Sequence, residues 1–478
     1  MRLPAALRLN ILANGSLQLR QGQIPNSNMN DLTRIKTIVL VMMENRSFDH
    51  MLGYLSLPPF KRPGVDGQSL DPAWLAKFTN SDNGHPFHPF LSTNPYTMPD
   101  DFDPPHERNA VAANLGALTG GSYAMNGFMS GIPSTVSSDP AVRKLVMSYF
   151  GAEQAPTNHF FAQNFAICNR YFCSLPAGTH PNRLMSLSGF SEIDVNATVL
   201  PAQPVIYDWL NDRGVTWRVY HEGIPVLALM PNWIPPILAD DEHFRSFEQL
   251  GEDLLNTPPD DLPQVIFVEP TYQDAPHLGP ASDDHAPAGI STGQEFLMQV
   301  YNALTASPSV WQQSAMIVNY DEHGGFFDHV SPPLIPTDPP AGSTYPRFTS
   351  LGVRTPAFVI SPFVKAGTVS QELLDHLSVL KFLGERFDAN RSHSTMVDAR
   401  PVKSISAVFN LDHPRTDVPA APSLQSFIAR RPPPPPGLVA PPPDTEMRQG
   451  FRDAVERMKQ HGATADHPKF GPLIRAMR

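Results

Sequence analysis

The segment AMIVNYDEHGG, residues 315–325, decides the fold that we predict for this chain. Its apolar half is typical of a strand buried in a parallel sheet, and the two glycines allow a sharp turn just after it. In open α/β sheets, ligands bind beyond the carboxyl ends of the strands. Asp321 and Glu322 stand at this position, and adjacent carboxylates repel each other unless a cation or a shared proton lies between them. A metal ion is the simplest resident, although a capped turn with solvated acids explains the segment equally well.

Other apolar runs predict further strands, separated by helices. We expect strands at residues 37–43, 215–220, 264–268 and 357–360, and helices at residues 292–305 and 372–387. Residues 139–172 look mostly helical, whereas residues 56–110 are rich in Pro, Asp, Asn and His and look like a long functional loop region. The alternation of strands and helices predicts an α/β fold with a mostly parallel central sheet sandwiched between helices.

Composition limits the classes of function. The 478 residues suffice for one large α/β domain or two ordinary ones, and 41% are hydrophobic. The net charge is -11 and no basic run dominates, which disfavours binding to nucleic acid or to an anionic membrane surface. No segment predicts a transmembrane helix. Cys168 and Cys173 are too few for a disulfide framework, and we expect small core residues, with a local disulfide or a reactive thiol as alternatives.

We predict three regions along the chain. Residues 1–34 form an N-terminal extension without a clear Sec signal peptide, and residues 35–412 form the main domain. Residues 413–478 form a proline-rich extension that ends in a helix at about residues 445–462. The proline runs at 432–436 and 441–443 are typical of polyproline II segments.

Three polar clusters follow predicted strands or turns, and together they suit a metal site. An oxygen-liganded divalent ion needs two or three carboxylates, an amide oxygen and room for a substrate. The candidate ligands are Glu44, Asn45, Asp321 and Glu322. Thr179 lies in a turn between Gly178 and Pro181 and supplies a hydroxyl. A hydroxyl on a metal loses its proton more easily and becomes a competent nucleophile.

Three longer motifs carry a resemblance to a known family. They are MENRSFDH at residues 43–50, GTHPNR at residues 178–183 and YDEHGGFFDHV at residues 320–330, with shorter matches at 103–107, 126–128, 170–172 and 375–378. In this order they resemble the phosphoesterase family of bacterial phospholipases C and related acid phosphatases, within the alkaline phosphatase superfamily. The resemblance covers about residues 35–390. It implies that residues 35–412 are a phosphoesterase catalytic domain with an alkaline-phosphatase-like fold.

The resemblance implies roles for individual residues. Glu44, Asn45, Asp321, Glu322 and Thr179 match positions around one divalent metal ion, whose identity (Ca, Mg, Mn or Zn) stays open. Thr179 also matches the nucleophile, which would form a phosphothreonine intermediate. His106 and His285 match active-site histidines, of which His106 contacts phosphate, and a histidine near phosphate can protonate the leaving oxygen.

Four residues are weaker candidates for substrate binding: His221, Asn182, Arg183 and His329. His221 is equally an ordinary histidine at the end of a strand. Arg183 either contacts phosphate or pairs with an acid to brace its turn. Asp328 and His329 either touch substrate or orient the Asp321-Glu322 turn.

The implied function is a metal-dependent phosphoester hydrolase of the phospholipase C type, which cleaves phospholipids or related phosphodiesters. The alternatives are a broad-specificity acid phosphatase acting on monoesters and an inactive phosphate-binding protein. The family's lipases resemble longer chains with C-terminal β-modules, so the proline-rich end weakens the lipase interpretation. Aromatic loop residues form either a lipid-facing rim or loop packing: Trp74, Phe87, Phe90 and Phe102. The resemblance implies a secreted or periplasmic protein, and nothing indicates an oligomeric state.

Overall fold

A computed structural model describes residues 31–433, 436–441 and 444–477. Leu32 and the residues after it belong to one compact unit. Most of the predicted N-terminal extension lies outside the described residues, and Leu32–Arg34, in its described part, forms a helical turn. Four prolines of the predicted polyproline segments (434, 435, 442 and 443) lie outside them as well, so this conformation stays a prediction.

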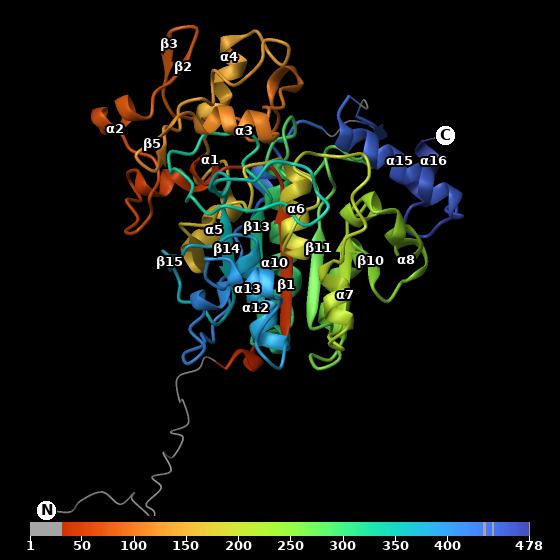
Figure 1. Ribbon diagram of the computed structural model, residues 1–478. Helices are drawn as coiled ribbons and strands as arrows, with labels where there is room; N and C mark the ends of the chain where they lie inside the picture. Colours follow the sequence, from red (N-terminus) through yellow and green to blue (C-terminus); the bar gives the residue numbers. More distant parts are fainter. Residues whose placement is uncertain (1–30, 434–435, 442–443, 478) are drawn as a thin grey trace, which may run out of the picture. The chain divides into compact units, whose positions relative to one another are not determined.

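A central sheet organises the described residues (Figure 1). Its strands, in spatial order, are β10 (Phe244–Ser246), β9 (Trp217–His221), β11 (Val265–Glu269), β1 (Thr37–Met43), β13 (Ser314–Tyr320), β14 (Ala357–Ile360), β8 (Ala166–Cys168) and β15 (Val369–Ser370). Only β14 runs antiparallel to its neighbours β13 and β8; the other pairings in this sheet are parallel. The predicted mostly parallel α/β sheet is confirmed.

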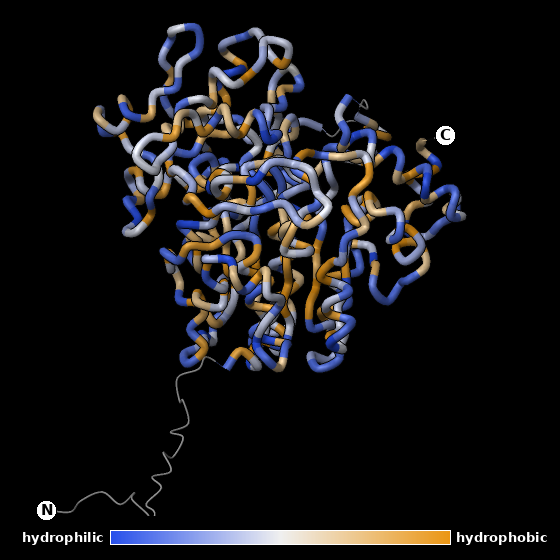
Figure 2. The backbone as a smooth tube through the Cα atoms, in the orientation of Figure 1, coloured by the Kyte–Doolittle hydropathy of each residue, from blue (hydrophilic) through white to orange (hydrophobic). Residues whose placement is uncertain are grey.

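Both faces of this sheet are covered. All seven residues of β13 are buried, although alternate side chains point to opposite faces. Figure 2 shows the central strands as hydrophobic tubes, in keeping with this burial. The helices include α1 (Phe48–Leu52), α5 (Pro156–Asn164), α6 (Thr179–Ser188), α7 (Ile206–Asn211), α8 (Ile234–Ala239), α9 (Leu250–Asn256), α10 (Ser291–Thr305), α12 (Leu377–Phe387) and α13 (Thr395–Ala399). Helix α10 contacts α5 and α9, and helix α12 contacts α6 and α13.

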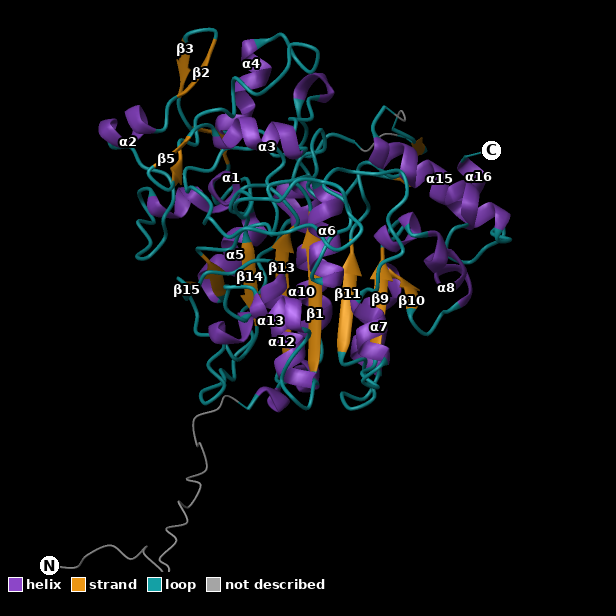
Figure 3. Ribbon diagram, viewed as in Figure 1, coloured by secondary structure: helices purple, strands orange, loops and turns teal. Residues whose placement is uncertain are grey.

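A second hydrophobic cluster lies in the segment between α1 and α5, where the sequence predicted a long loop region. That segment contains α2 (Pro72–Lys77), β2 (Asn80–Asp82), β3 (His85–Phe87), β4 (Phe90–Leu91), α3 (Arg108–Leu115), β5 (Leu118–Thr119), β6 (Ser122–Tyr123), α4 (Pro140–Arg143) and β7 (Ser148–Tyr149). Phe102 is buried in the cluster, and Trp74, Phe87 and Phe90 pack against it. The aromatic residues of this region therefore serve packing, the second of the two interpretations. The segment lies beyond the carboxyl ends of the parallel strands (Figure 3).

Two features of residues 139–172 correct the prediction of a mostly helical stretch. Helices α4 and α5 are present, but Ser148–Tyr149 and Ala166–Cys168 are strands. A short apolar run such as Phe165–Cys168 suits either a helix or a buried strand, and the pairing of β8 with β14 selects the strand.

The prediction about the two cysteines is confirmed. Cys168 and Cys173 are both free and buried, as expected of small core residues. Among the described residues, no helix is long and apolar enough to cross a membrane.

The C-terminal segment folds onto the rest of the compact unit. Its elements are α14 (Gln425–Ile428), β16 (Leu438–Val439), α15 (Glu446–Gln460) and α16 (Gly471–Ala476). The predicted final helix corresponds to α15. Strand β16 pairs antiparallel with β12 (His277–Leu278), and α11 (Pro308–Trp311) completes the helices between β11 and β13.

We predict that Gly324→Ala destabilises the fold. Gly324 has φ +62°, and a Cβ there would lie 2.1 Å from the carbonyl oxygen of Asn45. We expect a loss of about 2 kcal/mol or more, from strain plus backbone displacement. The matched control is Gly84→Ala, which has φ +82° but no atom within 4 Å of the added carbon, and which should cost only about 1 kcal/mol. Urea unfolding of both variants measures the difference, and equal losses would contradict the prediction.

Candidate active site

The site begins where two neighbouring strands end side by side. Strands β1 and β13 pair in parallel with Met43 opposite Tyr320, so the chain leaves both strands at the same level. The amide of Asp321 donates to the carbonyl oxygen of Met43 at 3.1 Å, and the amide of Asn45 donates to Oδ1 of Asp321 at 3.0 Å. The predicted pairs Glu44-Asn45 and Asp321-Glu322 are therefore brought together, and all four side chains are buried.

The backbone at this junction is strained. Asn45 has φ +62°, a left-handed conformation that residues other than glycine rarely adopt. The close approach of Gly324 to Asn45 holds the turn, because no side chain fits between them. Such strain is maintained where the surrounding structure over-determines it, which is common at functional sites.

Thr179 reaches the same junction from another element. It is the first residue of α6, and its hydroxyl donates to Oδ1 of Asn45 at 3.4 Å. The turn before it is held by Asn182, whose amide group bonds the backbone of Leu175, Ala177 and Gly178. The N-terminal end of a helix favours anions, so a phosphate group next to Thr179 would be stabilised. Asn182, predicted to bind substrate, thus holds the turn that precedes Thr179.

Arg183 lies between the two acid pairs. Its Nη2 is 2.9 Å from Oε1 of Glu44, and its Nε is 3.8 Å from Oδ2 of Asp321. Burial acts to raise the pKa of Glu44, but Arg183 and His285 outweigh it, and the pKa is lowered. Burial and the nearby Glu44 raise the pKa of Asp321 to about 7. Arg183 therefore braces the acids, which was one of its two predicted roles.

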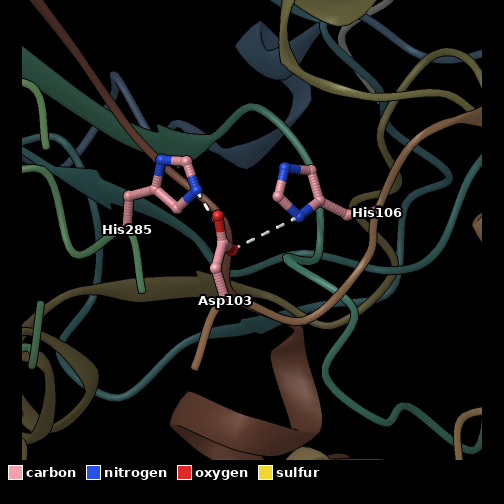
Figure 4. A group of neighbouring side chains, drawn as sticks. All are labelled: Asp103, His106 and His285. Atoms are coloured by element: carbon pink, nitrogen blue, oxygen red, sulfur yellow. Dashed lines mark ion pairs between the residues drawn. The ribbon is translucent and has the colours of Figure 1, made fainter. Parts of the chain in front are cut away.

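His106 and His285 form a second side of the site, with Asp103 between them (Figure 4). Asp103 Oδ1 is 3.8 Å from Nδ1 of His106 and 3.5 Å from Nε2 of His285. Burial alone would lower both histidine pKa values. The neighbouring Glu322 and Asp103 instead raise the pKa of His106 to about 9, and Asp103 and Asp274 raise that of His285.

These histidines are joined to the strand ends. His106 Nε2 lies 3.2 Å from the side-chain amide of Asn45, and His285 Nδ1 lies 3.2 Å from Oε2 of Glu44. The predicted residues Glu44, Asn45, Thr179, His106 and His285 therefore form one continuous set of contacts. Two cationic rings beside a helix N-terminus suit a phosphate group.

Several buried atoms fit a divalent cation. Oδ2 of Asp321 and Oε1 of Glu322 are buried and accept no hydrogen bond from a described residue. A buried, unpaired carboxylate oxygen is costly without a counter-charge. Three groups of described side chains are close enough to share an ion: Asp103, His106 and His285; Glu44, Asp283 and His285; and Asp49, Asp328 and His329.

None of these groups contains Asp321 or Glu322, and Arg183 lies between Asp321 and Glu44. The two carboxylate oxygens without a hydrogen bond still make the predicted oxygen-rich ligand set chemically suited to a metal.

Two histidines support the acids without having been assigned a site role from the sequence. His323 Nδ1 is 3.0 Å from Oε2 of Glu322, and its Nε2 is 3.1 Å from the amide of Asn114. His376 Nε2 is 2.8 Å from the carbonyl oxygen of Asp321. His323 stood in the sequence motif beside the acids and His376 in the shorter match at residues 375–378, but only the structure shows that both contact the acids.

His221 and His329 contact other parts of the structure. His221 Nδ1 is 2.7 Å from the carbonyl oxygen of Gly223, and its ring stacks on Phe470. His329 Nδ1 and Nε2 lie 2.6 Å from Asp49 and 3.0 Å from Asp66. His221 therefore lies at a strand end, as in its structural alternative, whereas His329 contacts Asp49 and Asp66 and not the Asp321-Glu322 turn.

The motifs and the geometry agree with a comparison of the whole sequence. Residues 35–390 match the sequence model of the phosphoesterase family. The chain belongs to the phosphoesterase family. Its membership and its relatives make it a hydrolase of phosphoester bonds.

The relatives are phospholipases C. Non-specific phospholipase C1 of Arabidopsis thaliana is 31% identical over 431 residues, which cover 86% of this chain and 77% of that protein. Phospholipase C A of Mycobacterium tuberculosis is 30% identical over 440 residues, which cover 80% of this chain and 78% of that protein. A solved structure of an alkaline phosphatase superfamily protein from Vibrio parahaemolyticus is more distant, with 10% identity, a TM-score of 0.31 and coverage of 64% of this chain and 82% of that chain.

We predict that His329 stabilises the fold in a pH-dependent way. Burial acts to lower its pKa, but Asp49 outweighs burial and the pKa is about 9, against about 6.5 when unfolded. Its contribution is therefore complete below pH 6.5 and is lost as the pH rises through 9. We expect His329→Gln to lower stability by at most about 3 kcal/mol at pH 6 and by little at pH 10.

The measurement is the difference in urea midpoint between the wild type and His329→Gln at the two pH values. Groups that titrate in both proteins cancel in this difference. A difference that grows between pH 6 and pH 10 would contradict the assignment.

Proposed function

We propose that this chain is a metal-dependent phospholipase C that cleaves phospholipids or related phosphodiesters, with Thr179 as its nucleophile. The single observation that carries the proposal is the hydroxyl of Thr179 next to Asn45, at the junction with the buried acids Asp321 and Glu322, each of which has an oxygen without a hydrogen bond. The nature of the relatives supports the choice of substrate class, since both are phospholipases C.

Glu44, Asn45, Asp321 and Glu322 would hold the metal, with Thr179 facing it. When bound, a divalent ion would lower the pKa of the threonine hydroxyl and neutralise charge on the phosphoryl oxygens. The oxygen-rich ligands favour a hard ion such as Ca or Mg, and Mn and Zn remain open. Arg183 balances the acids and keeps their side chains in place.

The reaction proceeds in two displacements. Oγ1 of Thr179 attacks phosphorus, the bond from phosphorus to the glycerol oxygen breaks, and the enzyme carries a phosphothreonine. Water then attacks phosphorus, and the bond to Thr179 breaks to release the phosphorylated headgroup. Phosphoryl transfer needs mainly positioning and stabilisation of the equatorial oxygens, which the N-terminal end of α6 and the histidine pair provide.

His106 and His285 handle the protons of these steps. Their rings lie edge to face with centroids 5.4 Å apart. The proton of the threonine hydroxyl passes to solvent as Oγ1 attacks, and one ring donates its proton to the departing glycerol oxygen. The same ring, now neutral, takes a proton from the attacking water as Oγ1 of Thr179 leaves as an alkoxide. The contact of His106 with Asn45 and that of His285 with Glu44 fix both rings against the strand ends.

We predict that Thr179→Ala lowers kcat by at least about a thousandfold on phosphatidylcholine and on p-nitrophenyl phosphorylcholine, because the nucleophile is lost. Thr179→Ser keeps a hydroxyl and should retain measurable turnover. Circular dichroism checks that both variants fold. Near-normal turnover by Thr179→Ala would overturn the nucleophile assignment.

We predict that removal of the metal inactivates the enzyme. Exhaustive chelation, verified by elemental analysis, should abolish turnover, and a divalent ion should restore it. Asp321→Asn and Glu322→Gln should lower the metal content of the purified protein, whereas Asp253→Asn should leave it unchanged, because Asp253 pairs with Arg245 and belongs to none of the groups of described side chains that could share an ion. Full activity of a verified metal-free protein would contradict the prediction.

One substrate panel tests the substrate class. Phosphatidylcholine, other phospholipids and simple monoesters are compared at equal concentration, and the products are identified. Diacylglycerol release with weak monoester turnover supports the phospholipase proposal. Efficient turnover of monoesters alone would replace it with the acid phosphatase alternative.

A further inference from the structure

The C-terminal segment reaches the active site although it lies beyond the residues that match the family. The family match ends at residue 390, and α15 begins at Glu446. Figure 1 shows α15 at the end of the sheet toward which β1 and β11 point. Its Phe451 stacks on Tyr272 with ring centroids 5.7 Å apart, and its Gly450 lies against the backbone of Thr198. The helix is therefore packed closely on the loops that build the site.

One side chain of this helix enters the charge network of the site. Nε of Arg448 lies 2.7 Å from Oδ1 of Asp274, and its Nη2 lies 3.7 Å from Oδ2 of Asp103. A third contact joins its Nη1 to Asp444 at 2.9 Å, one turn earlier. Only 12% of the Arg448 side chain is exposed, so its ion pairs are less screened by solvent than surface pairs.

The two acids that Arg448 contacts both face His285. Oδ1 of Asp103 is 3.5 Å from Nε2 of His285, and Oδ2 of Asp274 is 3.9 Å from its Nδ1. Each acid thus lies between Arg448 and the imidazole ring. Glu44 approaches the same ring, so without the guanidinium three carboxylates would face one histidine.

We propose that Arg448 is a positioning residue of the active site, supplied by the C-terminal segment, that holds Asp103 and Asp274 around His285 and offsets their charge. The inference rests on the proposed phosphoesterase site. Loss of the guanidinium leaves uncompensated carboxylates beside the place where an anionic phosphate binds, and like charges repel. Arg448 therefore favours phosphate binding without touching the phosphate.

The chain offers a matched control on the same helix. Arg452 lies one turn after Arg448, and its guanidinium bonds the carbonyl oxygens of Ala440 and Pro441. Both arginines dock α15, but only Arg448 contacts the acids around His285. Replacement of either by methionine keeps an apolar stem of similar length and removes the charge.

The experiment measures kcat, KM and the inhibition constant of inorganic phosphate for the wild type, Arg448→Met and Arg452→Met. The inhibition constant and KM do not depend on the fraction of active protein, so a purely structural role would leave them unchanged. We expect Arg448→Met to raise the inhibition constant about tenfold and to lower kcat/KM further, whereas Arg452→Met stays within twofold of the wild type. Arg448→Lys should recover part of the loss, because an ammonium group keeps the charge but contacts fewer acids.

A double variant tests the route through Asp103. In an Asp103→Asn background one of the acids is already neutral, so Arg448→Met should have a smaller effect on phosphate inhibition than in the wild type. Equal inhibition constants for Arg448→Met, Arg452→Met and the wild type would overturn the inference while the proposed function stands. A wild type without phosphoester turnover would instead overturn the proposed function, and this inference with it. If Arg448→Met does not fold, the inhibition constant of phosphate and KM are compared between Arg448→Lys and Arg452→Lys, and the same criteria apply.

Discussion

The structure depends on the parallel pairing of β1 with β13, which end at the same level. This register brings Glu44-Asn45 and Asp321-Glu322 together in a buried space, where four polar side chains follow two apolar strands. Two carboxylate oxygens there accept no hydrogen bond, and burial of such atoms is costly. The rest of the site offsets this cost in free energy, because Arg183 lies between the acids and two histidines lie beside them.

The surrounding elements are arranged to hold this junction. Gly324 permits close backbone contact with Asn45, and Asn182 holds the turn that delivers Thr179. The separate hydrophobic cluster between α1 and α5 supports the segment from which His106 and Asp103 reach the site. Residues from five distant parts of the chain thus lie within a few ångströms of their neighbours in the site. Catalysis by positioning requires such a preorganised arrangement of side chains.

Much of the site could be predicted because its chemistry is local in the sequence. An apolar run followed by adjacent acids can be interpreted from consecutive residues alone. The same holds for a threonine in a glycine-bounded turn. The role of Asn182 could not be predicted from the sequence. Its side-chain amide forms hydrogen bonds with backbone groups that come together only in the folded turn. The contacts of His221 and His329 could not be predicted for a similar reason: their neighbours, Phe470 and Asp49, are far away in the sequence. The strand at Ala166–Cys168 was missed because only pairing with β14 distinguishes it from a helix.

The sequence by itself determined the α/β class, the strand ends that carry the acids and the family to which the chain belongs. These properties follow from hydrophobic periodicity and from motifs that are contiguous. The tertiary structure alone decided how far apart the acids lie, how Arg183 separates them, and that Arg448 of the C-terminal segment joins the site. The physical reason is that electrostatic energies depend on distance and burial, and a linear sequence specifies neither for residues that are hundreds of positions apart.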